Sequence, residues 1–134
     1  MKKFENYVSN LRVLEGAGKE NLENEFIISG IIDKFSIQFE LGWKVLKELL
    51  AYEGSKAALT GSPRGVIKEA YKVYSFFDGE IWLYMLKDRN DTAHIYDGNA
   101  AKELVKRILG KYIAEFVRLE KELTDYYGDS LKTI

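Results

Sequence analysis

The sequence predicts an all-α fold, an antiparallel four-helix-type bundle with an additional short helix. Apolar residues recur every three or four positions, and no stretch alternates apolar and polar residues over the length of a convincing strand. Proline, which breaks helix interiors, occurs once in 134 residues. Short connections between the expected helices favour antiparallel neighbours. We expect one domain over residues 1–134, with residues 126–134 frayed.

Two helices are expected in the first 55 residues. Two glycines end the first helix, whose apolar positions are Phe4, Tyr7, Val8, Leu11 and Leu14, followed by Gly16 and Gly18. Asn24 is placed to cap the second and longest helix, which ends at Gly54 and Ser55. The apolar stripe of this second helix contains Ile27, Ile31, Phe35, Phe39, Gly42, Leu46, Leu49 and Leu50.

Three more helices follow a small, polar loop over residues 54–61. Ser62 provides a hydroxyl cap, and Pro63 takes the first helical position, where no N–H is needed. The short helix that starts there has Val66, Ile67, Ala70, Tyr71 and Tyr74 on its apolar face. The next helix, capped at 78–80, shows Trp82, Met85, Leu86 and Arg89 on one face. After a polar break at 97–99, the last helix has apolar positions at Leu104, Val105, Ile108, Leu109, Tyr112, Ile113, Phe116, Leu119 and Leu123.

Composition excludes several classes of protein. The chain has no cysteine, which excludes a disulfide framework, a thiolate nucleophile and a cysteine-based metal site. Its 20 Lys+Arg against 21 Asp+Glu argue against a dedicated DNA-binding protein, which needs an excess of cations at phosphates. The uncharged runs are shorter than the roughly 20 apolar residues that span a bilayer, and the N-terminus has no signal-peptide pattern. We expect a soluble, cytoplasmic protein without a membrane or DNA partner.

The segment from Arg89 to Asp97 concentrates the residues with chemical potential, including the single histidine, His94. An arginine fork binds phosphate with two hydrogen bonds, and a histidine can transfer a proton near neutral pH. Arg89 and His94 lie about 140° apart on a continuous helix, so they can approach only if the helix ends near His94. Asn90 and His94 share a face while the helix lasts. This set suits nucleotide binding or cleavage of an RNA phosphodiester.

Two interpretations of this segment stay open. Cleavage needs a base for the attacking hydroxyl and an acid for the leaving oxygen, and a single histidine supplies only one of them. Two chains would then have to meet at His94. The alternative is structural, in which Arg89, Asp91 and His94 form a polar cluster that seals the end of a bundle helix.

The second predicted helix carries a further cluster around Trp43. Trp43 lies one position from the apolar stripe, so it either widens the core face or supports a dimer interface. Lys44 and Lys47 share a helix face and can steer an anionic nucleotide, or simply face solvent. Glu40 and Lys44 have the spacing of an i,i+4 ion pair.

Three motifs make the sequence similar to a known family. Arg89-x4-His94-x-Tyr96 matches the Arg-x(4–6)-His motif of the HEPN superfamily. Over most of the chain, the motifs resemble those of the nucleotidyltransferase substrate-binding protein family, a HEPN-like branch. They are Phe35-x3-Phe39-Glu40-Leu41-Gly42-Trp43-Lys44-x2-Lys47, Ser62-Pro63-Arg64-x2-Ile67-x2-Ala70, and Trp82-x6-Arg89-Asn90-x3-His94-x-Tyr96. Gly42 replaces the usual alanine, which predicts closer helix packing.

The resemblance implies a homodimeric bundle encoded beside a minimal nucleotidyltransferase. That partner would supply the catalytic carboxylates, Mg²⁺ and the nucleoside triphosphate, with no cofactor in this chain. The present chain would complete the substrate or nucleotide site, which the resemblance assigns to Arg89, Asn90, His94 and Tyr96. Arg64, near a helix N-terminus, and Lys44 are weaker candidates for contact with an anion.

The resemblance also implies an alternative function. In related HEPN toxin–antitoxin pairs the bundle is a metal-independent RNase, and its partner silences it by adding AMP to the motif tyrosine. Under this alternative Arg89 and His94 would be catalytic in a dimer, RNA would be the substrate, and Tyr96 would be the modified residue.

Two short patterns superficially resemble nucleotidyltransferase machinery within this chain. Gly61-Ser62 is similar to a Gly-Ser loop, and Asp78-x-Glu80 to a metal-binding carboxylate pair. Those carboxylates have to lie on a sheet, where Mg²⁺ can bridge them to phosphates. Here an amphipathic helix separates the two patterns, so we interpret both as helix caps and expect no nucleotidyl transfer by this chain alone.

Overall fold

The computed structural model describes residues 1–56, 58, 61–94 and 97–134. The described residues form six α-helices and no β-strand, which confirms the all-α prediction. The helices are α1 (Lys2–Leu14), α2 (Glu25–Tyr52), α3 (Pro63–Val73), α4 (Gly79–Asp91), α5 (Gly98–Arg107) and α6 (Ile113–Tyr127). A π-helical turn, Ile108–Tyr112, joins α5 directly to α6, so these three pieces form one continuous rod.

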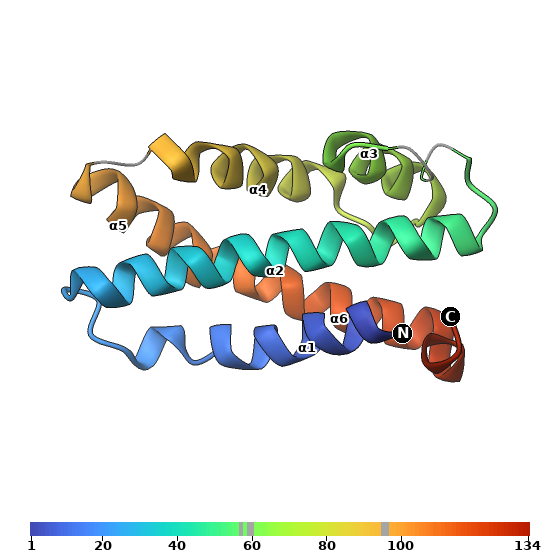
Figure 1. Ribbon diagram of the computed structural model, residues 1–134, viewed down its shortest axis with the longest axis horizontal. Coiled ribbons are helices and arrows are strands. Elements are labelled where there is room, and N and C mark those ends of the chain that lie inside the picture. Colours follow the sequence, from blue (N-terminus) through green and yellow to red (C-terminus); the bar gives the residue numbers. More distant parts are fainter. Residues whose placement is uncertain (57, 59–60, 95–96) are drawn as a thin grey trace.

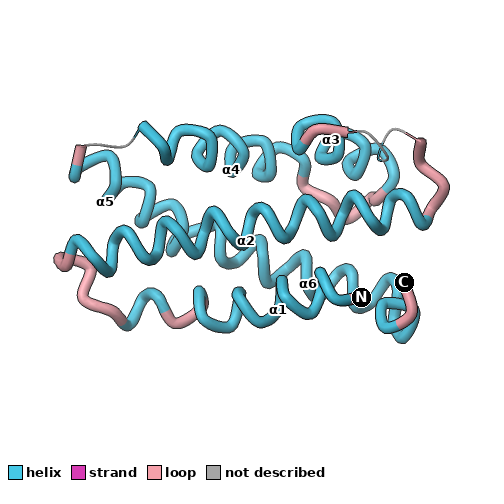
Figure 2. The backbone as a smooth tube through the Cα atoms, in the orientation of Figure 1, coloured by secondary structure: helices cyan, strands magenta, loops and turns pink. Residues whose placement is uncertain are grey.

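Helix α2 runs through the middle of the bundle (Figure 1) and packs against α1, α3, α4 and α5. Helix α1 lies along one side of α2, and α3 and α4 lie along the other, while the α5–α6 rod crosses α2 diagonally. The longer connections lie at the two ends of the bundle (Figure 2). This arrangement is the expected bundle with one additional short helix, α3.

Side-chain caps start four of the helices, three of them at predicted cap positions and the fourth, Asp97, within the predicted polar break. Each cap oxygen accepts a hydrogen bond from a backbone N–H in the first turn, as helix N-termini require. The caps are Asn24 for α2, Ser62 for α3, Asp78 for α4 and Asp97 for α5. Asp78 accepts from the N–H of Ile81 at 3.2 Å, which confirms that it is a helix cap.

The predicted apolar stripes form one core, with one exception. The stripe residues of α1, α2 and α6 are buried or partly buried, and so are Val66, Ile67 and Ala70 of α3. Tyr71 was predicted to lie on the same apolar face of α3, but it is 66% exposed, so that assignment is wrong. Its side chain instead lies against Gly79 at the start of α4. A Cβ added at Gly79 would lie 3.2 Å from both Cβ and Cδ2 of Tyr71.

Gly42 allows α4 to pack directly on α2. A Cβ at this position would lie 2.5 Å from Cη2 of Trp82, closer than carbon atoms approach, and would make a tight contact of 3.2 Å with Cε2 of Tyr7. The ring of Trp82 is fully buried, and its indole N–H donates to the buried carboxylate of Glu115 at 3.1 Å. The prediction that Gly42 serves close helix packing is therefore confirmed.

Within residues 126–134, the segment that we expected to fray, Tyr127 and Leu131 are buried, whereas most of the other residues are exposed. The Tyr127 hydroxyl lies 2.5 Å from the hydroxyl of Tyr74, and Leu131 is only 7% exposed. The ammonium group of Met1 donates to the carbonyl oxygen of Leu131 at 2.6 Å, which holds the two termini together.

Within the described ranges, no helix combines the length and hydrophobicity needed to cross a membrane.

Replacing Gly42 with alanine is expected to destabilise the protein by about 1–3 kcal/mol, because the new Cβ would push Trp82 out of its packed position. Gly30→Ala on the same helix is the matched control. Gly30 is exposed and has no atom within 4 Å of an added Cβ, so its substitution should stabilise α2 by about 0.5–1 kcal/mol. Urea unfolding of both variants measures the difference, and equal effects of the two substitutions would contradict the packing account.

Candidate functional site

Arg89 lies in the last turn of α4, against the middle of α2. Its Nη2 donates a short hydrogen bond to Oε2 of Glu40, and its Nη1 donates to Oδ1 of Asn90 at 2.9 Å. The guanidinium also lies 5.7 Å from the ring centroid of Phe39, within range of a cation–π interaction. The Arg89 side chain is 28% exposed, so the α2–α4 seam holds it firmly and still leaves it accessible to a ligand.

Glu40 connects two cations on the surface of α2 and α4. One carboxylate oxygen contacts Arg89, and the other pairs with Nζ of Lys44 at 3.4 Å, which confirms the predicted i,i+4 pair. Burial by itself raises the pKa of Glu40, but the nearby indole N–H of Trp43, the hydrogen bonds from Arg89 and Lys44, and the charge of Arg89 together lower it below its ordinary value. Glu40 is therefore ionised at neutral pH.

Trp43 belongs to the core edge beside this pair, as one of its two interpretations predicted. It is only 9% exposed, and the ammonium groups of Lys44 and Lys47 lie 6.0 and 5.9 Å from its ring centroid. Its indole N–H neighbours Glu40 closely enough to affect the pKa of that carboxyl, yet it has no hydrogen-bond partner among the described residues. The cluster formed by Glu40, Trp43, Lys44, Lys47 and Arg89 is called the Glu40 cluster below.

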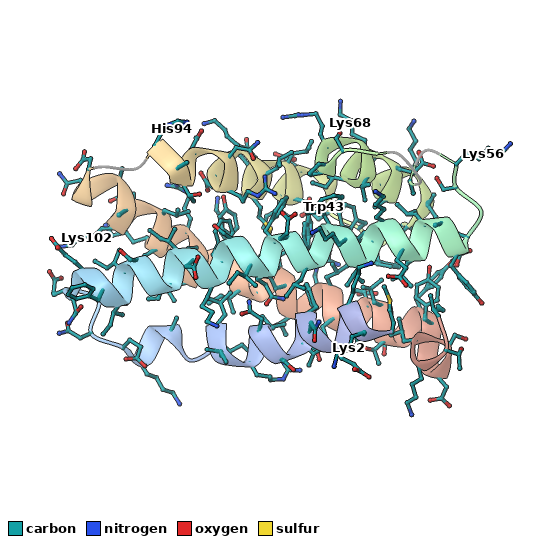
Figure 3. The ribbon with its side chains drawn as sticks, viewed as in Figure 1. Lys2, Trp43, Lys56, Lys68, His94 and Lys102 are labelled. Carbon is teal, nitrogen blue, oxygen red and sulfur yellow. The ribbon has the colours of Figure 1, made fainter. Side chains whose placement is uncertain are left out.

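The helix ends just before His94, as the spacing of Arg89 and His94 required. Helix α4 stops at Asp91, and a 3-10 turn covers Thr92–His94. The hydroxyl of Thr92 donates to the carbonyl oxygen of Arg89 at 2.7 Å and so satisfies one of the free carbonyls at the helix end. His94 is exposed at the end of α4, whereas Trp43 lies near the middle of α2 (Figure 3).

The remaining predicted site residues have different outcomes. Asn90 contacts Arg89 directly, and Lys44 reaches it through Glu40. Arg64 is exposed in the first turn of α3, and α3 lies beyond the end of α4 that is opposite to His94 (Figure 1). The structure therefore separates Arg64 from the rest of the set. Tyr96 lies outside the described residues.

Sequence reasoning missed a second polar cluster directly beside Arg89. Asp88 accepts hydrogen bonds from Nε of Arg107 at 2.9 Å and from Nη2 of Arg107 at 3.1 Å. It also accepts from the hydroxyl of Tyr112 at 2.5 Å, and burial together with Asp88 raises the pKa of Tyr112 above its ordinary value. The π turn at Ile108–Tyr112 presents Tyr112 to this contact, and such turns are common near functional sites.

The Asp88 cluster fixes the end of α4 to the α5–α6 rod. Asp88 is bound to the α5–α6 rod, and the next residue, Arg89, is bound to α2. Two ion pairs on adjacent residues thus tie the end of α4 to both α2 and the rod. An apolar pattern with a 3.6-residue period contains no sign of a π turn, and no local spacing links Asp88 with Arg107.

The described residues include no group of three or more histidine, cysteine, aspartate or glutamate side chains arranged to hold a metal ion. What the Glu40 cluster offers is a set of cationic donors around one carboxylate, with a buried indole N–H beside it. Such a set suits the binding of an anionic group, above all a phosphate.

Comparison with known proteins agrees with this chemistry. Residues 2–125, from α1 through most of α6, match the sequence model of the family described as "Nucleotidyltransferase substrate binding protein like". No curated protein matches the sequence. Because the match covers nearly the whole chain, the protein belongs to the nucleotidyltransferase substrate-binding protein-like family.

Proposed function

We propose that the chain is the non-catalytic substrate- or nucleotide-binding subunit of a two-component nucleotidyltransferase. The observation that carries the proposal is Arg89, held at the α2–α4 seam by Glu40 and Asn90. These contacts use two of the five guanidinium N–H donors, and the partly exposed side chain can offer others to a phosphate. Lys44 and Lys47 add positive charge beside it.

The catalytic subunit is proposed to be a separate minimal nucleotidyltransferase that carries Mg²⁺ and the nucleoside triphosphate. The family name associates its members with nucleotidyltransferases. Asp78, which resembles part of a metal-binding carboxylate pair in the sequence, accepts the N–H of Ile81 as a helix cap instead. In the proposed assembly this chain acts in the cytoplasm as a homodimer, and Asn90, His94 and Tyr96 extend the site from Arg89.

Arg89→Ala is expected to weaken ATP binding at least tenfold, because a charged hydrogen bond contributes about 1.5–3 kcal/mol. Isothermal titration calorimetry measures the affinity, for the chain alone and for its complex with the partner. Arg12→Ala is the control, since Arg12 lies on α1, where it pairs with Glu15 and Glu120. Equal losses in the two variants, or none in Arg89→Ala, would contradict a specific site at Arg89.

The existence of the partner subunit is tested by the gene neighbourhood and by co-expression. A neighbouring reading frame with a Gly-Ser…Asp-x-Asp pattern is expected, and its product should co-purify with this chain on co-expression. A solitary gene, or a neighbouring nucleotidyltransferase that does not bind the chain, would count against the two-component assembly.

RNA cleavage is the second candidate, and the exposure of His94 beyond the end of α4 favours it. Since the chain has one histidine, two copies would have to bring their His94 side chains together. The binding role predicts equal RNA integrity when the wild-type protein and His94→Ala are expressed. Cleavage that His94→Ala abolishes would favour the RNase, and AMP addition at Tyr96 by partner and ATP would then support a toxin–antitoxin pair.

A further inference from the structure

The two tryptophans of the chain differ in how their indole N–H groups are satisfied. Trp82 donates to Glu115 at 3.1 Å. Trp43 lies at the core edge, at 9% exposure, and its indole nitrogen is buried without a partner in the described part of the chain. A buried donor without an acceptor is costly and uncommon in folded proteins, so its presence beside a cluster of charges calls for a physical reason.

Glu40 is the acceptor that helix geometry places next to Trp43. The two residues are three positions apart on α2, and helical side chains lean toward the N-terminus, so the indole of Trp43 lies over the turn that contains Glu40. The carboxylate is nevertheless bound by Arg89 and Lys44. The influence of Trp43 on the pKa of Glu40 is consistent with this proximity. Glu40 therefore has the indole N–H of Trp43 within its reach in addition to the two cations that it already binds.

The charges of the cluster indicate which ligand can change this arrangement. Arg89, Lys44 and Lys47 carry three positive charges, and Glu40 supplies one negative charge to the same surface. The excess of two positive charges favours a ligand with at least two negative charges, such as a diphosphate or a triphosphate, over a monovalent anion. Such a ligand competes directly with Glu40 for Arg89 and Lys44.

We propose that Glu40 is a built-in competitor that gates an oligophosphate site at Arg89 and Lys44. In the chain without ligand, the carboxylate occupies both cations. When an oligophosphate binds them, the carboxylate turns to the indole N–H of Trp43, which gains the acceptor that it lacks. This inference rests on the proposed nucleotide-binding function and specifies how that site is controlled.

The direct test is a titration of the full chain with inorganic pyrophosphate, followed by ¹H–¹⁵N NMR of the indole groups. Trp43→Phe assigns the two indole signals. The Trp43 signal is expected to move downfield as its hydrogen bond forms, while the Trp82 signal, already bonded to Glu115, serves as the internal reference and stays in place. Pyrophosphate binding with an unmoved Trp43 signal would overturn the gate.

Affinities provide an independent test by calorimetry with the same probe. Glu40→Gln keeps the size of the side chain but removes its charge, so pyrophosphate is expected to bind about tenfold more tightly. Trp43→Phe removes the alternative donor and should weaken binding about threefold in the wild-type background, but have no effect in the Glu40→Gln background. Unchanged or weaker binding by Glu40→Gln would show that Glu40 is not a competitor.

The outcomes separate the gate from the function on which it rests. Binding that depends on Arg89 but is unaffected by Glu40→Gln overturns the gate alone. The absence of pyrophosphate binding in both the wild type and Glu40→Gln overturns the gate and the proposed function together. Thermal unfolding of each variant verifies that it is folded. Should Trp43→Phe not fold, the pyrophosphate affinity of Glu40→Gln decides the question.

Discussion

The missing side chain at Gly42 lets the ring of Trp82 lie directly on α2, and the geometry of the candidate site depends on this contact. Trp82 belongs to α4, and two turns further along the same helix Arg89 reaches Glu40 of α2. If α4 were held away from α2 by the width of a methyl group, the guanidinium would lose its position over Phe39 as well as its contact with the carboxylate. The glycine thus acts on the site through helix spacing.

Asp88 also holds the end of α4, through contacts with a different part of the bundle. Its bonds to Arg107 and Tyr112 tie the helix to the α5–α6 rod, next to the residue that is tied to α2. An arginine next to a residue that is anchored in this way binds a phosphate with a defined geometry at a lower entropic cost, because less conformational freedom of the helix end remains to be lost on binding. Beyond this support the helix stops at Asp91, which leaves His94 exposed at the end of the bundle.

Much of the fold could be predicted from the sequence because its signals are local. Helix caps at Asn24, Ser62 and Asp78 and the single proline act within one turn of the chain, and the apolar period identifies the core faces. Tyr71 was misassigned because period alone does not show which side of a short helix a neighbouring helix covers. The π turn and the packing of Leu131 against the N-terminus depend on contacts between distant segments.

The site was predictable to a smaller extent. Local spacing revealed the pair of Glu40 and Lys44, and it required the helix to end near His94. The pairing of Arg89 with Glu40 joins residues 49 positions apart, so only the fold could reveal it. The position of Arg64 also depends on the fold. The family motifs group Arg64 with Arg89, but the arrangement of α3 and α4 separates the two residues.

The candidate site depends above all on the ion pair between Arg89 and Glu40, and a double-mutant cycle tests this pair most directly. Glu40→Gln, Arg89→Gln and the double variant are compared with the wild type in equilibrium urea unfolding. The partial burial of both side chains predicts a coupling free energy of about 1 kcal/mol, above the range of most exposed pairs. Effects that simply add, with a coupling of less than about 0.3 kcal/mol, would contradict the pairing of α2 and α4 at this site.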